Sequence, residues 1–121
     1  MNSAYLVSYV RYISALLITL SNDFYLFFLL QAYAHPEHAD TLEQVYAKIT
    51  RLAQTEPGIV HYCIARDGDD SNSFHFFERY TGRKAFEEHM SLPIVKKLFE
   101  EDKYVRGIKA KLVRAILPKD I

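Results

Sequence analysis

The sequence predicts an α+β fold of the ferredoxin-like type, in which a four-stranded antiparallel sheet carries both of its helices on one face. Apolar and amphipathic segments follow one another in the order strand, helix, strand, strand, helix, strand. A run of turn-forming residues separates the two central strands, as in an antiparallel hairpin. At 121 residues the chain is long enough for one such domain and too short for two.

The composition indicates a folded protein with an aromatic interior. Half of the residues are hydrophobic, and there are nine Tyr and eight Phe. Lys and Arg together number 15, as do Asp and Glu, so the net charge is zero and a nucleic-acid partner is not expected. The single cysteine, Cys63, has no internal disulfide partner. A buried, reduced thiol and a cytoplasmic location are therefore expected.

Residues 1–23 form an apolar N-terminal extension whose hydrophobic residues recur at helical spacing. An extra helix packed on the domain or on its partner is the favoured interpretation. A membrane or export segment is the second, although Arg11 lies in the middle of the stretch and Thr19-Leu20-Ser21 is a poor cleavage site. A misassigned start codon is the third interpretation. The folded domain is then residues 24–121.

The first strand of the domain is predicted from Phe24 to Tyr33, where almost every position is apolar. Such a pattern is typical of a strand that is buried on both faces. One domain of this size has helices to cover one face, so we expect the second face to be covered by another copy of the chain. The sequence therefore predicts a homodimer.

A helix is predicted to begin at His35-Pro36-Glu37, because proline and an acidic residue are both favoured in a first turn. Pro57-Gly58 ends this helix. Its inward stripe comprises Leu42, Val45, Tyr46, Ile49, Leu52 and Ala53.

The next two strands are predicted from Ile59 to Arg66 and from Phe74 to Tyr80, joined by a turn over residues 67–72. A second long helix is predicted from Gly82 to Met90. Ser91 and Pro93 then predict a break and a short helix from Pro93 to about Glu101. The last strand is predicted from Ile108 to Leu117.

His89 and Glu78 are the candidate catalytic residues. His89 lies on the apolar side of its helix, and its imidazole titrates near neutral pH, so it suits proton removal. Glu78 interrupts an apolar strand and needs a partner, for which His89, Arg79 and Arg66 are candidates. A structural role is an equal alternative for His89 and a slightly favoured one for Glu78.

The predicted substrate-binding residues are aromatic or imidazole side chains near these two: Tyr62, Tyr80, Phe76, Phe86 and His75. Tyr62 lies opposite Glu78 if the hairpin has an even register, which also brings Val60 and Ile64 to the same face. Tyrosines in an aromatic core with a hydrated tip remain the alternative.

We predict neither a metal site nor a bound cofactor. His35 and His38 lie at a helix start, while His61 and His75 lie on different strands without a second cysteine or an acidic cluster. With four glycines, the sequence has neither a phosphate-binding loop nor a dinucleotide fingerprint.

Several spaced motifs together resemble the antibiotic biosynthesis monooxygenase (ABM) domain family over about residues 24–117. They are Glu56-Pro57-Gly58, Tyr62, the acidic turn from Asp67, Phe74 with Phe77-Glu78-Arg79-Tyr80, and Ala85-Phe86-Glu87-Glu88-His89 followed by Pro93. The resemblance implies a dimeric α/β barrel. The family includes cofactor-independent oxygenases of anthrones and quinols, haem-degrading enzymes and an isomerase.

The resemblance disfavours the haem-degrading branch. Its members have an asparagine, a tryptophan and a haem-ligating histidine where this sequence has Leu30, Tyr80 and Leu98 or Phe99. The expected function is therefore oxidation of a small, electron-rich aromatic substrate by O₂, with His89 as the base and Glu78 as the group that orients it. A small-molecule isomerase and a non-catalytic, dimeric ligand-binding or stress-related module are the alternatives.

Overall fold

The computed structural model describes residues 26–114 and residue 116. The predicted N-terminal helix over residues 1–23 lies outside them. The elements, in chain order, are β1 (Leu26–Ala34), the short 3₁₀ helix η1 (Pro36–His38), α2 (Ala39–Ala53), β2 (Ile59–Arg66), β3 (Ser73–Tyr80), α3 (Arg83–Met90), α4 (Pro93–Glu101) and β4 (Val105–Val113).

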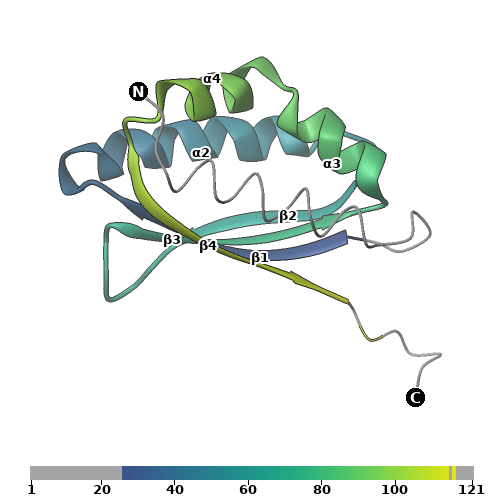
Figure 1. Ribbon diagram of the computed structural model, residues 1–121, viewed down its shortest axis with the longest axis horizontal. Helices are drawn as coiled ribbons and strands as arrows, with labels where there is room; N and C mark the ends of the chain where they lie inside the picture. Colours follow the sequence, from purple (N-terminus) through teal and green to yellow (C-terminus); the bar gives the residue numbers. More distant parts are fainter. Residues whose placement is uncertain (1–25, 115, 117–121) are drawn as a thin grey trace.

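The strands form one antiparallel sheet in the order β2-β3-β1-β4. Helices α2, α3 and α4 lie on the same face of this sheet (Figure 1). The predicted ferredoxin-like fold is confirmed, with the break at Ser91 and Leu92 that makes α3 and α4 separate helices. The core lies between the sheet and the three helices.

Strand β1 is buried on its helix-facing side alone. Residues Leu26, Phe28 and Leu30 are buried, whereas the alternate residues Phe27 and Leu29 are half-buried. Because successive side chains point to opposite faces of a sheet, the second set lies on the face away from the helices. The prediction of burial on both faces is therefore not met within a single chain, and the homodimer stays a prediction.

The β2–β3 hairpin has the expected register. Tyr62 pairs with Glu78, and Ile64 pairs with Phe76. An irregularity between Ile59 and His61 takes Val60 out of this series, and its side chain is 49% exposed. The expected position of Val60 beside Tyr62 is wrong, because a β-bulge reorients the residue that it inserts.

Helix α2 buries Leu42, Tyr46 and Ile49 against the sheet, as its spacing predicts. Leu52 is 41% exposed and does not belong to the inward stripe, whereas Ala53 beside it is buried. Among the described residues, none of the helices has both the length and the apolar character that a membrane crossing requires.

Strand β4 begins three residues before the predicted start and ends at Val113. Val105 pairs with Ala34, at a point where the register with β1 shifts, and Val113 pairs with Phe27. Arg106 and Gly107 interrupt the apolar pattern, which is why the sequence did not indicate a strand there. Pairing with β1 therefore sets the bounds of β4.

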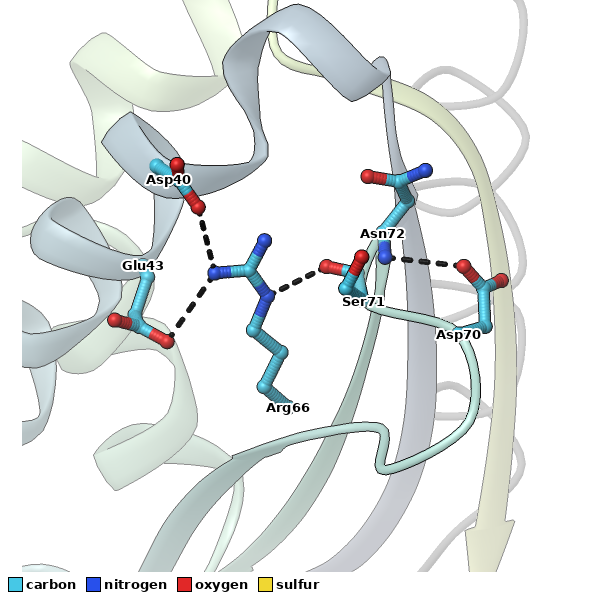
Figure 2. A network of polar contacts seen from close by, with 6 residues as sticks. All are labelled: Asp40, Glu43, Arg66, Asp70, Ser71 and Asn72. Atoms are coloured by element: carbon cyan, nitrogen blue, oxygen red, sulfur yellow. Dashed lines mark hydrogen bonds and ion pairs between the residues drawn. The ribbon is translucent and has the colours of Figure 1, made fainter.

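Arg66 links the β2–β3 hairpin to the start of α2 through hydrogen bonds (Figure 2). Its guanidinium donates to Asp40 Oδ1 at 2.9 Å, to Glu43 Oε1 at 3.4 Å and to the Ser71 carbonyl at 2.5 Å. Asn72 N–H donates in turn to Asp70 Oδ1 at 3.0 Å. These contacts hold the hairpin turn beside the first turns of α2.

Candidate functional site

A cavity of about 60 Å³ lies between the sheet and the helices. Its walls are mainly apolar, and Leu30, Ile49, Phe76, Val95 and Ile108 are among them. The polar side chains at its surface are Tyr46, Tyr62, Glu78, Asp102 and Tyr104. A concave, mainly apolar space with a small number of polar groups is typical of a small-molecule site.

Glu78 is the acidic group that β3 places in this cavity. The side chains at positions 74, 76, 78 and 80 all face the helices, so Glu78 is 6% exposed. The Tyr80 hydroxyl donates a hydrogen bond to Glu78 Oε1 at 2.5 Å. Burial raises the pKa of Glu78, while that hydrogen bond and the charge of His89 oppose the rise. A carboxyl group with a raised pKa is better suited to accept a proton.

His89 is buried on α3 and is hydrogen-bonded to Glu56 rather than to Glu78. Its Nδ1–H donates to Glu56 Oε2 at 2.9 Å. Its ring lies 4.9 Å from the Tyr62 ring and 5.8 Å from the Tyr80 ring, centroid to centroid. The expectation that Glu78 orients His89 through a hydrogen bond is therefore wrong. His89 lies behind the two tyrosines and is not one of the residues that line the cavity.

The segment Glu56-Pro57-Gly58 attaches α3 to the sheet at two points one turn apart. The Glu56 carboxylate binds His89, and Gly58 packs against Ala85. A Cβ atom on Gly58 would lie 2.4 Å from the Cβ atom of Ala85, so glycine is needed for this close approach.

The other predicted aromatic residues divide into two groups. Tyr62 and Phe76 line the cavity. Tyr80 and Phe86 instead pack on Phe28, with ring centroids 5.9 and 4.8 Å from that ring. Tyr80 and Phe86 therefore belong to the packed core beside the cavity and do not line the cavity itself.

His75 lies on the opposite face of the sheet, away from the helices. Positions on β3 alternate between faces, and Phe76 is the helix-facing neighbour of His75. His75 Nε2 donates to Asp67 Oδ2 at 2.6 Å, and with the backbone N–H groups of Asp69 and Asp70 it lowers the pKa of Asp67 to about 2. The prediction that His75 binds the substrate of this cavity is wrong, because the strand alternation points it elsewhere.

Three polar residues at the cavity were missed: Tyr46, Asp102 and Tyr104. Tyr46 was assigned to the core, and burial, with the charge of Glu78, raises the pKa of its hydroxyl. Asp102 and Tyr104 follow α4 in a segment that resembles an ordinary polar connection. The aromatic residue just before β4 is the one signal that could have placed this segment against the core.

Within residues 26–114, no group of three or more His, Cys, Asp or Glu side chains is arranged to hold a metal ion. Glu56 and His89 bring two such side chains together, and Asp67 and His75 bring two together on the other face of the sheet.

The family model for antibiotic biosynthesis monooxygenases matches residues 27–101. No curated protein matches the sequence. Among solved structures, the protein PA3566 from Pseudomonas aeruginosa is 19% identical over 81% of this chain and 100% of its own, with a TM-score of 0.72. The protein SO0527 from Shewanella oneidensis is 16% identical over 78% of this chain and 93% of its own, with a TM-score of 0.70. A structure described as an antibiotic biosynthesis monooxygenase is 21% identical over 76% of this chain and 99% of its own, with a TM-score of 0.68. These structures share the fold.

Proposed function

Because the chain belongs to the antibiotic biosynthesis monooxygenase family, we propose that it oxidises a small, electron-rich aromatic substrate with O₂ in the cavity beside Glu78. The substrate is of the quinol type, and it supplies the electrons itself, so the reaction needs no bound cofactor. The protein supplies a proton acceptor, an apolar enclosure and a fixed orientation.

The observation that carries the proposal is the position of Glu78, a buried carboxyl group in an otherwise apolar cavity. We assign it the role of base, which the sequence had suggested for His89. His89 and Glu56 form a pair behind the tyrosines, and the charge of the imidazole favours the ionised form of Glu78. His89 is thus a positioning residue that acts through Glu78.

The reaction begins when Glu78 takes a proton from a substrate hydroxyl group. The resulting anion transfers one electron to O₂, and the substrate radical and superoxide combine to form a carbon–oxygen bond. The proton held by Glu78 returns to the peroxide, which then loses water. For a hydroquinone, one atom of O₂ remains on the ring as the oxygen of a hydroxyquinone, and the other leaves in water.

The size of the cavity favours a single ring. A cavity of about 150 Å³ holds benzene, whereas this one measures about 60 Å³. Even one ring therefore requires the walls to move outward, and a three-ring anthrone requires a much larger movement. We propose a monocyclic hydroquinone as the substrate class.

The test is O₂ uptake by the purified full-length chain, without added flavin or metal, with hydroquinone, methylhydroquinone and anthrone. We expect uptake with the single-ring substrates. Glu78→Gln lowers the turnover rate by about 100-fold or more, which is the usual contribution of a positioned base. The exposed residue Glu88 provides the matched control, since Glu88→Gln makes the same chemical change on the surface of α3 and leaves the rate unchanged.

His89→Gln tests the positioning role. We expect this variant to have a lower rate. Its activity should also need a higher pH to appear, because the charge of His89 that favours ionised Glu78 is lost. Full activity in Glu78→Gln contradicts the assignment of the base. Turnover that does not consume O₂ contradicts the oxygenase and indicates proton transfer alone, as in an isomerase.

A further inference from the structure

Tyr46 is a tyrosine at the cavity that the proposed reaction does not use. It lies on α2 and lines the same apolar space as Glu78 of β3. Its side chain is 5% exposed, and its hydroxyl has no hydrogen-bond partner among the residues that the structure describes. The hydrogen bond that it receives from Thr50, at 2.8 Å, ends on the backbone carbonyl. A buried hydroxyl group without a partner is costly, so its position calls for an explanation.

The ring of Tyr46 is held beside Glu78 by two phenylalanines of β3. It meets the rings of Phe74 and Phe76 edge-on, with centroids 5.1 and 4.9 Å away and interplanar angles of 79° and 84°. Phe76 and Glu78 are successive side chains on the helix-facing side of β3, about 7 Å apart along the strand. Tyr46 and Glu78 can therefore contact the same small group of a ligand.

The electrostatics of the two groups suit a hydroxyl group placed between them. Burial and the charge of Glu78 raise the pKa of the Tyr46 hydroxyl, which therefore keeps its proton and acts as a donor. Glu78 Oε1 accepts the hydrogen bond of the Tyr80 hydroxyl, so Oε2 is the oxygen that is left to accept a proton. A donor and an acceptor that face one space match a hydroxyl group, which both accepts and donates.

We infer that Tyr46 donates a hydrogen bond to the substrate oxygen from which Glu78 takes the proton, and so stabilises the anion that forms there. The O–H bond of the substrate breaks, its proton moves to Glu78 Oε2, and the negative charge stays on the oxygen that faces the Tyr46 hydroxyl. This inference rests on the proposed function for the role of Glu78. Its test uses ionisation of a bound phenol without turnover, so the two can fail separately.

The test is a pH titration of 4-nitrophenol bound to the full-length chain. The phenolate form of this probe absorbs visible light, and its ring is too electron-poor to reduce O₂. Tyr46→Phe removes one hydrogen bond to a charged oxygen, so it should raise the pH at which the bound probe ionises by about one unit, or tenfold in the ionisation constant. The same rise is expected when Tyr46→Phe is added to Glu78→Gln, where solvent takes the proton.

Tyr33→Phe is the matched control, because it removes a hydroxyl from β1 on the face of the sheet away from the helices and does not touch the cavity. It should leave the ionisation of the bound probe unchanged. The melting temperature of the free protein gives a second readout. Tyr46→Phe keeps the ring and removes a hydroxyl without a partner, so it should melt at the same temperature as wild type or higher.

The same ionisation pH for the probe in wild type and Tyr46→Phe overturns the inference, as does a wild-type protein that does not bind 4-nitrophenol. A lower melting temperature in Tyr46→Phe also overturns it, because the hydroxyl would then have a structural partner. If O₂ uptake fails while the ionisation of the probe depends on Tyr46, the proposed oxygenase is wrong and the hydrogen-bond donor stands.

Discussion

At the scale of single residues, Glu78 connects the stability of the protein with its proposed chemistry. Its carboxyl group is buried by the alternation of β3, and burial makes the charged form unfavourable. The Tyr80 hydroxyl and the charge of His89 offset part of this cost. A base with a raised pKa is thus obtained at the expense of stability near neutral pH.

The effect of the buried Glu78 carboxyl group on stability can be measured with the Glu78→Gln variant. The folded pKa of Glu78 is raised above its ordinary value of 4.5, so the unfolded chain releases this proton at a lower pH than the folded chain does. The contribution of Glu78 to stability is full below pH 4.5 and is lost as the pH rises through the folded pKa. Each unit of pKa shift corresponds to about 1.4 kcal/mol.

We therefore expect the melting temperature of Glu78→Gln, relative to wild type, to increase between pH 4.5 and pH 7.5. Thermal unfolding at both pH values checks this, with the exposed Glu88→Gln as a control that shows no such change. A difference that shrinks as the pH rises would mean that Glu78 is stabilised in its charged form.

Some of the site could be predicted from single residues and some could not. The pairing of Tyr62 with Glu78 follows from the alternation of two strands and the turn between them, which are local features of the sequence. The contact between Glu56 and His89 joins residues 33 positions apart and depends on how α3 docks. Asp102 was missed because a left-handed residue after a helix turns its side chain inward without an apolar pattern to mark it.

At the scale of elements, the docking of α3 on the start of β2 determines where His89 lies. Gly58 allows the two backbones to approach, and the Thr81 N–H donates to the Gly58 carbonyl at 2.9 Å. Glu56, two residues earlier, binds His89 on the same helix. The segment Glu56-Pro57-Gly58 thus acts as a docking element for α3.

Gly58→Ala should destabilise the protein by about 1–3 kcal/mol, because the new Cβ atom would lie 2.4 Å from Ala85 Cβ and α3 must move. Gly68→Ala is the matched control, since a Cβ atom there meets no atom within 4 Å. Urea unfolding of the two variants measures the difference. Equal midpoints would show that α3 shifts without cost and that glycine is not needed at position 58.

The elements themselves were largely predictable, because their signals are local. Proline and glycine mark the ends of α2 and the start of α4, and the turn formers over residues 67–72 mark the hairpin. Strand β4 was placed three residues late because its bounds depend on pairing with β1, which lies far away in the sequence. Local patterns specify the type of an element better than its limits.

At the scale of the whole molecule, the sheet has one face covered by helices and one face that is not covered by the described part of the chain (Figure 1). Phe27, Leu29 and Tyr33 of β1 are half-buried on that face, and Phe77 of β3 is 40% exposed. Lys109 and Lys111 of β4 lie beside them. An apolar face with a charged border is typical of a surface that binds a partner.

We predict that a second copy of the chain covers this face, and Phe77→Arg tests it. A charge in the middle of an apolar interface is strongly unfavourable, so the variant should dissociate at least about tenfold more readily than wild type. Leu52→Arg is the matched control, because Leu52 is 41% exposed but lies on α2, on the other side of the sheet. Sedimentation equilibrium should find twice the mass of the chain for wild type and Leu52→Arg, and a lower mass for Phe77→Arg. A wild-type protein that remains monomeric at about 100 times the usual assay concentration would contradict the dimer. If Phe77→Arg instead has the same dimeric mass as Leu52→Arg, the interface lies elsewhere on the molecule.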